Sequence, residues 1–362
     1  MNGTDSQQPV ISVILLNYNG KDWMHRCLES LRAQTIFDKI EVLVADNAST
    51  DGSDKLAAEL IAGWPNGVFI QNGANIGFGA GSNRAVERAK GKYLFFLNPD
   101  VWLDPDCLER AYQGTEKAQV GAVGILVMDY DDDTVQARGG VGFDWFGIAI
   151  PPRRGRIPHT LFAACGFYFI RADLFRRVGG YDDQFFLYGE ESDLSWRVWL
   201  AGERIVHIPE ARMHHRGAAF VNPKGGTKIV EVRTSDLKRF YANRNNLLII
   251  LKNCQHLLLL LAIPYGLWIL AESLVGALLV RRFSFFTKTG MAAIADCWRL
   301  RHYIVDQRRK VKTYRKHSDF WMLRFFSPRF SRWEDIARIL KLGLPKVDRS
   351  NVPKSAAPQS RA

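Results

Sequence analysis

Asp100 follows a run of residues that is typical of a buried β-strand. Residues 93–97 are apolar and rich in aromatic side chains, as in strands that are covered on both faces of a mostly parallel sheet. Pro99 cannot donate a backbone hydrogen bond, so the strand is expected to end before it. Asp100 would then lie at the carboxyl edge of the sheet, where open α/β folds bind ligands. Opening a turn, or capping a helix near Asp104, is the alternative role of this carboxylate.

A second group of carboxylates, Glu190, Glu191 and Asp193, opens a predicted helix. The helix dipole favours anions at this end, so we expect these groups to be ionised. An ionised carboxylate can act as a general base that takes the proton from an attacking hydroxyl group. Acidic residues are also common as simple caps in the first turn of a helix. Arg197, one turn further along, is expected to pair with Asp193.

The elements that must position these groups alternate between strands and helices. Short hydrophobic runs at 10–16, 40–45 and 68–70 are each followed by a polar, turn-forming stretch and then by a predicted helix. This alternation predicts βαβ units, and therefore an α/β fold with a Rossmann-like, mostly parallel sheet. Polar residues follow each of these three strands: Asn17, Asp46 and Asn75.

Five segments of the chain, in this order, resemble the motifs of the inverting family 2 glycosyltransferases, which have a GT-A fold, and most closely their bacterial rhamnosyltransferase-like branch. The segments are residues 13–20, 44–53, 75–79, 97–100 and 186–194. One such segment would be a weak signal, but five in the family's order are specific. The resemblance implies transfer of a sugar from a nucleotide-sugar donor to an acceptor, with inversion at the anomeric carbon.

The resemblance also implies a nucleotide site and a metal site. Asp46 would accept hydrogen bonds from the base or ribose, with capping of the following turn as its alternative role, and Asn17 and Asn75 would shape the cleft. Asp100 matches the last residue of the family's D-x-D-type motif, with Asn98 in the first position. It would bind Mg²⁺ or Mn²⁺ at the donor diphosphate.

A histidine is the second metal ligand that the resemblance implies. His215 lies where many family members have a metal-contacting histidine, and an imidazole ligand would favour Mn²⁺. His214 is the alternative ligand, and an exposed histidine pair without a metal is the third possibility. Glu191 occupies the family's catalytic position, where Asp is usual. Because Glu is longer than Asp, Asp193 remains a possible substitute as general base.

The chain changes in character near residue 245. Residues 257–280 are apolar over a length that would span a bilayer. Pro264 and Glu272 argue against a plain span, so a kinked or interfacial helix pair in one leaflet is an equal alternative, and a buried helical hairpin is a third possibility. Arg, Lys and aromatic residues at 298–333 favour a cytoplasmic membrane interface. We therefore expect a GT-A domain at 8–245, a membrane-associated helical region at 246–345 and a disordered tail at 346–362.

Composition limits the partners. The 362 residues carry a formal net charge of +12, which favours an anionic partner such as lipid headgroups or a sugar nucleotide. We expect no nucleic acid, because no zinc, helix-turn-helix or RNP pattern accompanies the basic residues. The glycines at 77–81 lack the spacing of a dinucleotide-binding loop. The scattered cysteines and a polar N-terminus without an apolar signal-peptide core predict a reducing compartment.

The sequence thus predicts a metal-dependent glycosyltransferase at the cytoplasmic face of the inner (cell) membrane. Its donor would be a dTDP- or UDP-sugar, with L-rhamnose as one candidate, and its acceptor a growing cell-surface glycan or a lipid-linked acceptor. Two alternatives remain open. A non-catalytic, membrane-bound scaffold that binds nucleotide sugars is opposed by the intact acidic residues. A processive polysaccharide synthase is opposed by the lack of a Q-x-x-R-W motif.

Overall fold

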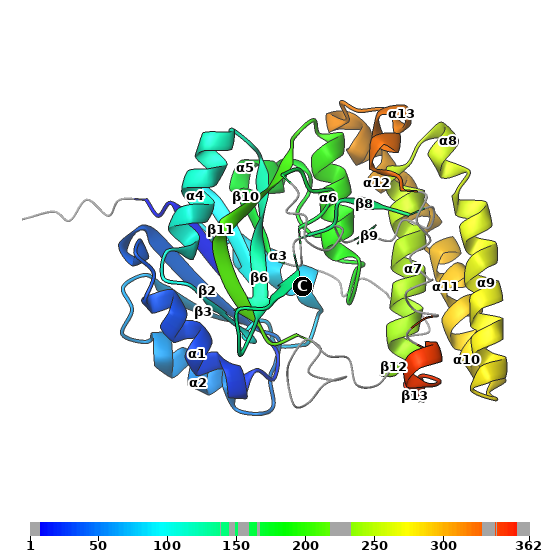
Figure 1. Cartoon of the computed structure of the whole chain (residues 1–362), viewed down its shortest axis with the longest axis horizontal. Coiled ribbons are helices and arrows are strands. Elements are labelled where there is room, and N and C mark those ends of the chain that lie inside the picture. Colours follow the sequence, from blue (N-terminus) through cyan, green and yellow to red (C-terminus); the bar gives the residue numbers. More distant parts are fainter. Residues whose placement is uncertain are drawn as a thin grey trace, which may run out of the picture.

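The structure, a computed structural model, describes residues 8–137, 139–144, 149–150, 159–164, 167–217, 233–327, 337 and 339–352. A nine-stranded sheet runs in the order β3-β2-β1-β4-β10-β6-β11-β5, with β7 paired to β6. A group of C-terminal helices lies beside the sheet, next to α6 (Figure 1). The described chain is therefore an α/β unit with an attached helical layer.

The first half of the sheet is parallel, as predicted. Its strands are β1 (Ile11–Asn17), β2 (Ile40–Asp46), β3 (Gly67–Gln71) and β4 (Tyr93–Leu97). Helices α1 (Lys21–Arg32), α2 (Ser53–Ile61) and α3 (Phe78–Val86) connect them. Strands β1, β2 and β4 are buried along their whole length, which accounts for their continuous apolar sequences. Asn17 and Asp46 end their strands directly opposite each other.

The other half of the sheet is mixed, which corrects the prediction of a mostly parallel sheet. Strand β10 (Tyr168–Arg171) is antiparallel to both β4 and β6 (Ala122–Asp129). Strand β6 is parallel to the long β11 (Ile205–His215), whose end is antiparallel to β5 (Val101–Leu103). Strand β7 (Val135–Ala137) pairs with β6 at this half of the sheet, and α4 (Cys107–Ala118) and α5 (Ala172–Arg177) are its helices. Strands β8 (Gly142–Phe143) and β9 (Ala149–Ile150) form a separate two-stranded sheet.

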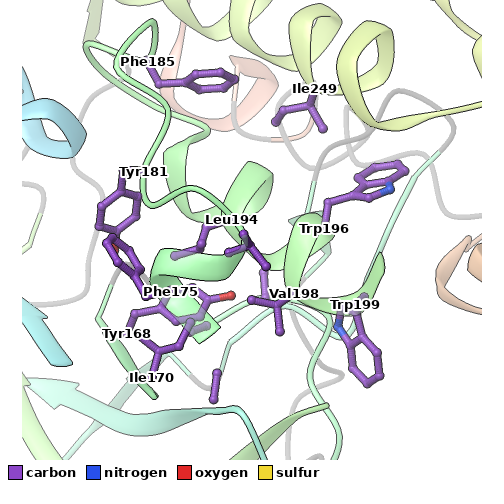
Figure 2. Close-up of a cluster of buried hydrophobic side chains, with 14 of the residues drawn as sticks. Tyr168, Ile170, Phe175, Tyr181, Phe185, Leu194, Trp196, Val198, Trp199 and Ile249 are labelled. Atoms are coloured by element: carbon purple, nitrogen blue, oxygen red, sulfur yellow. The ribbon is translucent and has the colours of Figure 1, made fainter. Parts of the chain in front are cut away.

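Helix α6 (Glu190–Leu200) carries the acidic cluster and is embedded in the core. Leu194, Val198 and Leu200 are fully buried, and Trp196 and Trp199 are buried as well. Figure 2 shows these side chains packed with others from β10, α5 and the C-terminal helices: Tyr168, Ile170, Phe175 and Ile249. Helix α6 is thus covered on nearly all sides, by β11, α7 and α12 among others.

The C-terminal helices pack on α6 and on one another. They are α7 (Asp236–Asn253), α8 (His256–Leu259), α9 (Ala262–Leu279), α10 (Phe283–Phe286), a π-helical turn (Thr287–Met291), α11 (Ala292–Arg299), α12 (Arg301–Tyr314) and α13 (Asp319–Met322). Helix α7 contacts α6, α9, α11 and α12. It also passes through residue 245, so the boundary that the sequence predicted there is not a break in the structure.

Helix α9 has one buried face and one exposed face. Tyr265, Ile269, Ser273 and Ala277 are buried at four-residue spacing, whereas Leu267 and Leu278 on the other side are 64% and 70% exposed. The exposed face excludes a fully buried hairpin. Among the described residues, one stretch, His256–Leu279, is long and apolar enough to cross a membrane, and 22% of its most apolar window is buried. This is weak evidence for membrane association.

Part of the predicted disordered tail is ordered. Lys346–Asp348 forms β13, which pairs in parallel with β12 (Arg233–Ser235). Asp348 also accepts a hydrogen bond from Arg233 Nε at 2.9 Å. The polar composition of the tail does not indicate a strand. The strand that it pairs with, β12, lies over a hundred residues earlier in the chain, so no local pattern links the two. Residues 353–362 lie outside the described part.

Candidate active site

Polar side chains gather at the carboxyl ends of β1 and β2. The Asp46 carboxylate is fully buried. It accepts hydrogen bonds from Asn17 Nδ2 at 2.7 Å, from the Ser49 backbone N–H at 2.9 Å and hydroxyl at 2.6 Å, and from Gln71 Nε2 at 3.0 Å. The turn-capping role of Asp46 is therefore present in the structure. Gln71 is the exposed member of this set, so it is the partner that an entering ligand could replace.

The loop that carries Asn75 lies between this polar group and the segment from residue 182 to residue 193, which carries Glu190 and Glu191 and is called the acidic loop below. Asn75 Oδ1 accepts from Asn47 Nδ2 at 3.3 Å and from the Gly77 backbone N–H at 3.2 Å. Gly77 has a φ of +88°, and a Cβ atom there would lie 2.6 Å from the Phe186 carbonyl oxygen. Only glycine fits this contact. The contact brings the loop after β3 against the loop that leads to Glu190.

Asp100 and His215 meet at the ends of β5 and β11. The antiparallel register pairs His215 with Val101, and His215 Nε2 lies 3.3 Å from Asp100 Oδ2. Each side chain is about a quarter exposed, at 22% for His215 and 24% for Asp100. The sheet thus brings together two residues that are more than a hundred positions apart in the sequence.

Gln136 fixes the orientation of the His215 ring. Its Nε2 donates to the His215 carbonyl oxygen at 3.0 Å, so its Oε1 accepts from His215 Nδ1 at 2.7 Å. Because Nδ1 carries the proton in this hydrogen bond, the lone pair of neutral Nε2 faces the Asp100 carboxylate. Two acceptors that face each other require a positive charge between them, either a proton or a cation.

This pair fits a divalent cation that is shared with substrate. Among the described residues there is no group of three or more His, Cys, Asp or Glu side chains that could hold a metal. Mg²⁺ commonly uses one or two carboxylates together with substrate phosphates and water. Asp100 and His215 would be the protein ligands of such an ion. Asn98, half-buried two residues before Asp100, lies at the same sheet edge.

His214 points to the other side of β11. Its ring stacks on Trp102 with a centroid distance of 3.6 Å. Nδ1 lies 2.9 Å from the Asp129 carbonyl oxygen, and Nε2 lies 3.1 Å from Asp104 Oδ1. Since both ring nitrogens have protein partners and the ring is buried, His214 does not face Asp100, and of the two histidines only His215 is available as a ligand there.

Glu190 and Glu191 begin α6 directly after two residues in the left-handed region, Tyr188 with φ +67° and Gly189 with φ +89°. Glu190 is buried, and no described residue donates to its Oε2. Burial and the neighbouring Glu191 charge raise the pKa of Glu190 well above its usual value. Burial also raises the pKa of the half-buried Glu191. For these two residues, desolvation therefore outweighs the helix dipole that was expected to keep them ionised.

Asp193 has a different role from its two neighbours. It is fully buried, and it pairs with Arg197, as predicted, at 2.8 Å, and with Lys252 at 3.0 Å. Burial alone would raise the pKa of Asp193, but the charges of Arg197 and Lys252 and a hydrogen bond from Asn253 lower it to about 2. These contacts make Asp193 part of a buried ion pair between α6 and α7. Its role as a substitute base stays a prediction.

Several important residues were not found from the sequence. Gln136 and the α7 residues that contact the acidic loop, Asn245 and Lys252, belong to no motif, and only tertiary contacts bring them to the site. The polar residues among the apolar ones of α7 could have indicated these contacts, because buried polar side chains need hydrogen-bond partners.

The sheet, together with the polar loops along its edge, defines a GT-A-type glycosyltransferase fold. The structure is similar to that of GalNAc-T7 with UDP, GalNAc and Mn²⁺, with a TM-score of 0.62 and 16% identity; the match covers 94% of this chain and 60% of that one. It is also similar to the mannosyltransferase PcManGT from Pyrobaculum calidifontis in complex with GDP-Man and Mn²⁺. There the TM-score is 0.51 and the identity 18%, over 85% of this chain and 88% of that one.

Residues 12–179 match the model of Glycosyl transferase family 2, so this part of the chain belongs to that family. It is therefore a glycosyltransferase that uses a nucleotide-sugar donor. The chain is 27% identical to N-acetylglucosaminyl-diphospho-decaprenol L-rhamnosyltransferase of Mycobacterium tuberculosis, over 57% of this chain and 76% of that protein. It is 28% identical to the O-antigen biosynthesis protein RfbC of Myxococcus xanthus, over 58% of this chain and 18% of that protein.

Proposed function

We propose that this chain is an inverting, metal-dependent transferase that moves a deoxyhexose, L-rhamnose, from a dTDP-sugar to a lipid-linked glycan acceptor. The observation that supports the metal-dependent part is the Asp100–His215 pair, because a carboxylate and an imidazole that face each other at the sheet edge can together bind a cation. The choice of sugar and acceptor is supported by the similarity to the mycobacterial rhamnosyltransferase.

The nucleotide would bind at the carboxyl ends of β1 to β3. Asp46 and Asn17 form the floor of this region, and Gln71 would move away as the base or ribose reaches Asp46. Asn75 and Asn98 line its two sides, on the loops after β3 and β4. A divalent ion at Asp100 and His215 would neutralise the charge that develops on the leaving diphosphate.

Glu191 would act as the general base. Its carboxylate takes the proton of the acceptor hydroxyl while that oxygen forms a bond to the anomeric carbon. The bond from the anomeric carbon to the diphosphate oxygen breaks on the opposite face, and the nucleoside diphosphate leaves. The raised pKa of Glu191 suits this role, because a more basic carboxylate is a better proton acceptor. Burial and the charge of Glu191 raise the pKa of Glu190, which favours a protonated Glu190 beside an ionised Glu191.

The exposed face of α9 would rest on the membrane that holds the lipid-linked acceptor. This face carries Ile263, Leu267, Leu274 and Leu278, and Arg281 follows it at an exposed position. Apolar side chains that enter the bilayer interface, with basic residues near anionic headgroups, are typical of interfacial helices. This arrangement would keep the site at the cytoplasmic surface.

Nucleotide binding tests the donor part of this proposal. Calorimetric titration of the protein with dTDP and with UDP, with and without Mn²⁺, should give metal-dependent binding that favours dTDP and is lost in Asp100→Ala. A preference for UDP would contradict the deoxysugar donor. Transfer is then measured with dTDP-rhamnose and N-acetylglucosaminyl-diphospho-decaprenol, and nucleotide binding without any transfer would instead favour the non-catalytic scaffold.

A further inference from the structure

Helix α7 contacts the acidic loop along one polar face. Four side chains of this helix are almost completely buried, in two neighbouring pairs that lie about two turns apart. They are Arg244, Asn245, Lys252 and Asn253. All four donate hydrogen bonds to the segment between residues 182 and 193, which ends in the first turn of α6. Burying two cations and two amides is costly, so contacts of this kind are kept only where their partners are well placed.

Asn245 holds the part of the loop that directly precedes the two glutamates. Its Nδ2 donates to the carbonyl oxygens of Leu187 at 2.9 Å and of Tyr188 at 2.6 Å. Arg244 Nε in turn donates to Asn245 Oδ1 at 2.8 Å, which fixes the orientation of the amide. One side chain therefore orients two successive peptide groups immediately before Gly189.

This part of the loop is strained. A left-handed conformation is unfavourable for a non-glycine residue, because its Cβ atom comes too close to the following carbonyl oxygen, and Tyr188 has a φ of +67°. Such a conformation persists only where its surroundings hold it. A Cβ atom on Gly189 would lie 3.3 Å from Asn245 Cβ, so the helix also packs closely on the turn.

The second end of the segment is fixed by Lys252 and Asn253. Lys252 pairs with Asp182 at the start of the loop and with Asp193 in α6 at 3.0 Å. Asn253 Nδ2 donates to the same Asp193 oxygen at 2.8 Å. Asp182 also accepts from the Tyr303 hydroxyl of α12 at 2.5 Å. The segment is thus held at both ends by the helical layer.

We infer that α7 is a positioning element for catalysis, in which Asn245 holds the Tyr188–Gly189 turn so that Glu191 meets the acceptor hydroxyl. The inference rests on the proposed role of Glu191 as general base. The opposite side of the loop packs on Gly77, near the region proposed for the nucleotide. The residues proposed for the nucleotide lie at the carboxyl ends of β1 and β2 and on the loops after β3 and β4. Loss of the Asn245 contacts should therefore affect the chemical step more than donor binding.

The chain offers a closely matched control. Asn243 is also a buried amide on α7, but its Nδ2 donates to Ser273 of α9 at 3.4 Å and to the Thr289 carbonyl oxygen at 3.1 Å. Asn245→Asp and Asn243→Asp each replace a buried amide by a carboxylate of the same shape and remove its donor. Asn245→Ala and Asn243→Ala are the second pair, in case a buried carboxylate prevents folding.

The experiment compares these pairs in hydrogen exchange and in turnover of dTDP-rhamnose with N-acetylglucosaminyl-diphospho-decaprenol. Asn245→Asp should lower kcat by about 10- to 100-fold, as expected for a displaced catalytic group, and leave the dissociation constant of dTDP within roughly twofold of wild type. The amides of residues 187–193 should exchange faster in this variant and not in Asn243→Asp. In Asn245→Ala, which adds no charge, the acid limb of the pH profile should move to lower pH, because a looser loop hydrates Glu191.

Unchanged exchange at residues 187–193, or an equal kcat in the Asn245 and Asn243 variants, would overturn the inference. Failure of the proposed function gives different results. A fully active Glu191→Gln would remove Glu191 from its role whatever Asn245 does. A wild-type protein that is inactive with these two compounds would contradict the proposed substrates, and the exchange comparison would still decide whether Asn245 holds the turn.

Discussion

Within the acidic cluster, neighbouring carboxylates differ because their surroundings differ. Asp193 lies beside two cations and stays ionised, whereas Glu190 and Glu191 lose water without gaining a positive partner among the described contacts. The same helix terminus therefore holds one structural anion and two groups with raised pKa values. Desolvation and specific ion pairs decide the charge of each group here, and both exceed the modest effect of the helix dipole.

Glu191→Gln tests the base at this scale. The amide has the same shape but cannot take a proton, so kcat should fall by about 10²- to 10⁴-fold, while circular dichroism and nucleotide affinity stay unchanged. In the wild type, activity requires ionised Glu191 and should be lost as pH falls through its raised pKa. The acid limb should therefore lie above the value of about 4.3 for an ordinary Glu. An acid limb at or below that value would contradict the assignment.

Gln136→Leu tests the orientation of the metal ligand. Without Oε1, His215 loses the hydrogen bond that keeps the proton on Nδ1. Removing such a supporting partner typically weakens metal binding by about 10- to 100-fold. Calorimetry with Mn²⁺ in the presence of dTDP measures this loss. Gln113→Leu, at an exposed position on α4, is the control and should bind Mn²⁺ as the wild type does.

At the scale of elements, α6 and α7 form one structural unit. The Asp193 carboxylate joins them through Lys252 and Asn253, and Ile249 of α7 packs in the apolar cluster around α6 (Figure 2). Helix α7 is thus part of the catalytic domain on one face. On its other face Arg239 pairs with Glu272 of α9. The charge of Glu272, which argued against a membrane span, is compensated by this contact.

Asp193→Ala should destabilise the fold. Removing this carboxylate leaves Arg197 and Lys252 buried without their shared partner, which typically costs about 3–5 kcal/mol. Because the pKa of Asp193 is lowered to about 2, its contribution to the free energy of unfolding should be complete above an ordinary Asp pKa of about 4. This contribution should disappear as the pH falls towards 2. Urea unfolding at pH 7 and at lower pH measures both effects. Asp306→Ala removes an exposed pair with Arg309 and should change stability by less than about 1 kcal/mol.

At the scale of the whole molecule, the apolar surface is concentrated on the C-terminal helices. The strongly exposed side chains of α9 lie opposite its buried stripe, and α9 itself packs on α7. The catalytic sheet therefore occupies one side of the molecule and the apolar face the other (Figure 1). An enzyme that acts on a lipid-linked acceptor would need both parts to be held together rigidly, and α7 provides this connection.

Vesicle sedimentation tests the apolar face. The wild type should sediment with vesicles that contain phosphatidylglycerol, and the double variant Leu267→Glu, Leu278→Glu should remain in the supernatant. The variant Leu267→Ala, Leu278→Ala should bind to an intermediate extent, because it loses apolar area but adds no charge. Both positions are exposed, so unfolding midpoints should match the wild type. Equal sedimentation of all three proteins would contradict a membrane role for this face.

The sequence by itself determined the local features. Continuous apolar runs specify β1, β2 and β4, since only a strand buried on both faces tolerates them, and Asp46 and Asp100 follow from where these runs end. The periodic apolar residues of α6 and its pairing of Asp193 with Arg197 were also predictable, because these residues are neighbours on one helix.

Only the tertiary structure decided what depends on distant contacts. It placed His215, and not His214, opposite Asp100, because the antiparallel register of β5 and β11 sets which side chain faces the site. It gave β10 its direction, ordered the tail through β12, and separated Asp193 from the two glutamates by bringing Lys252 beside it. Pairing direction, register and burial are properties of segments that meet across the fold, so the local sequence does not encode them in a readable pattern.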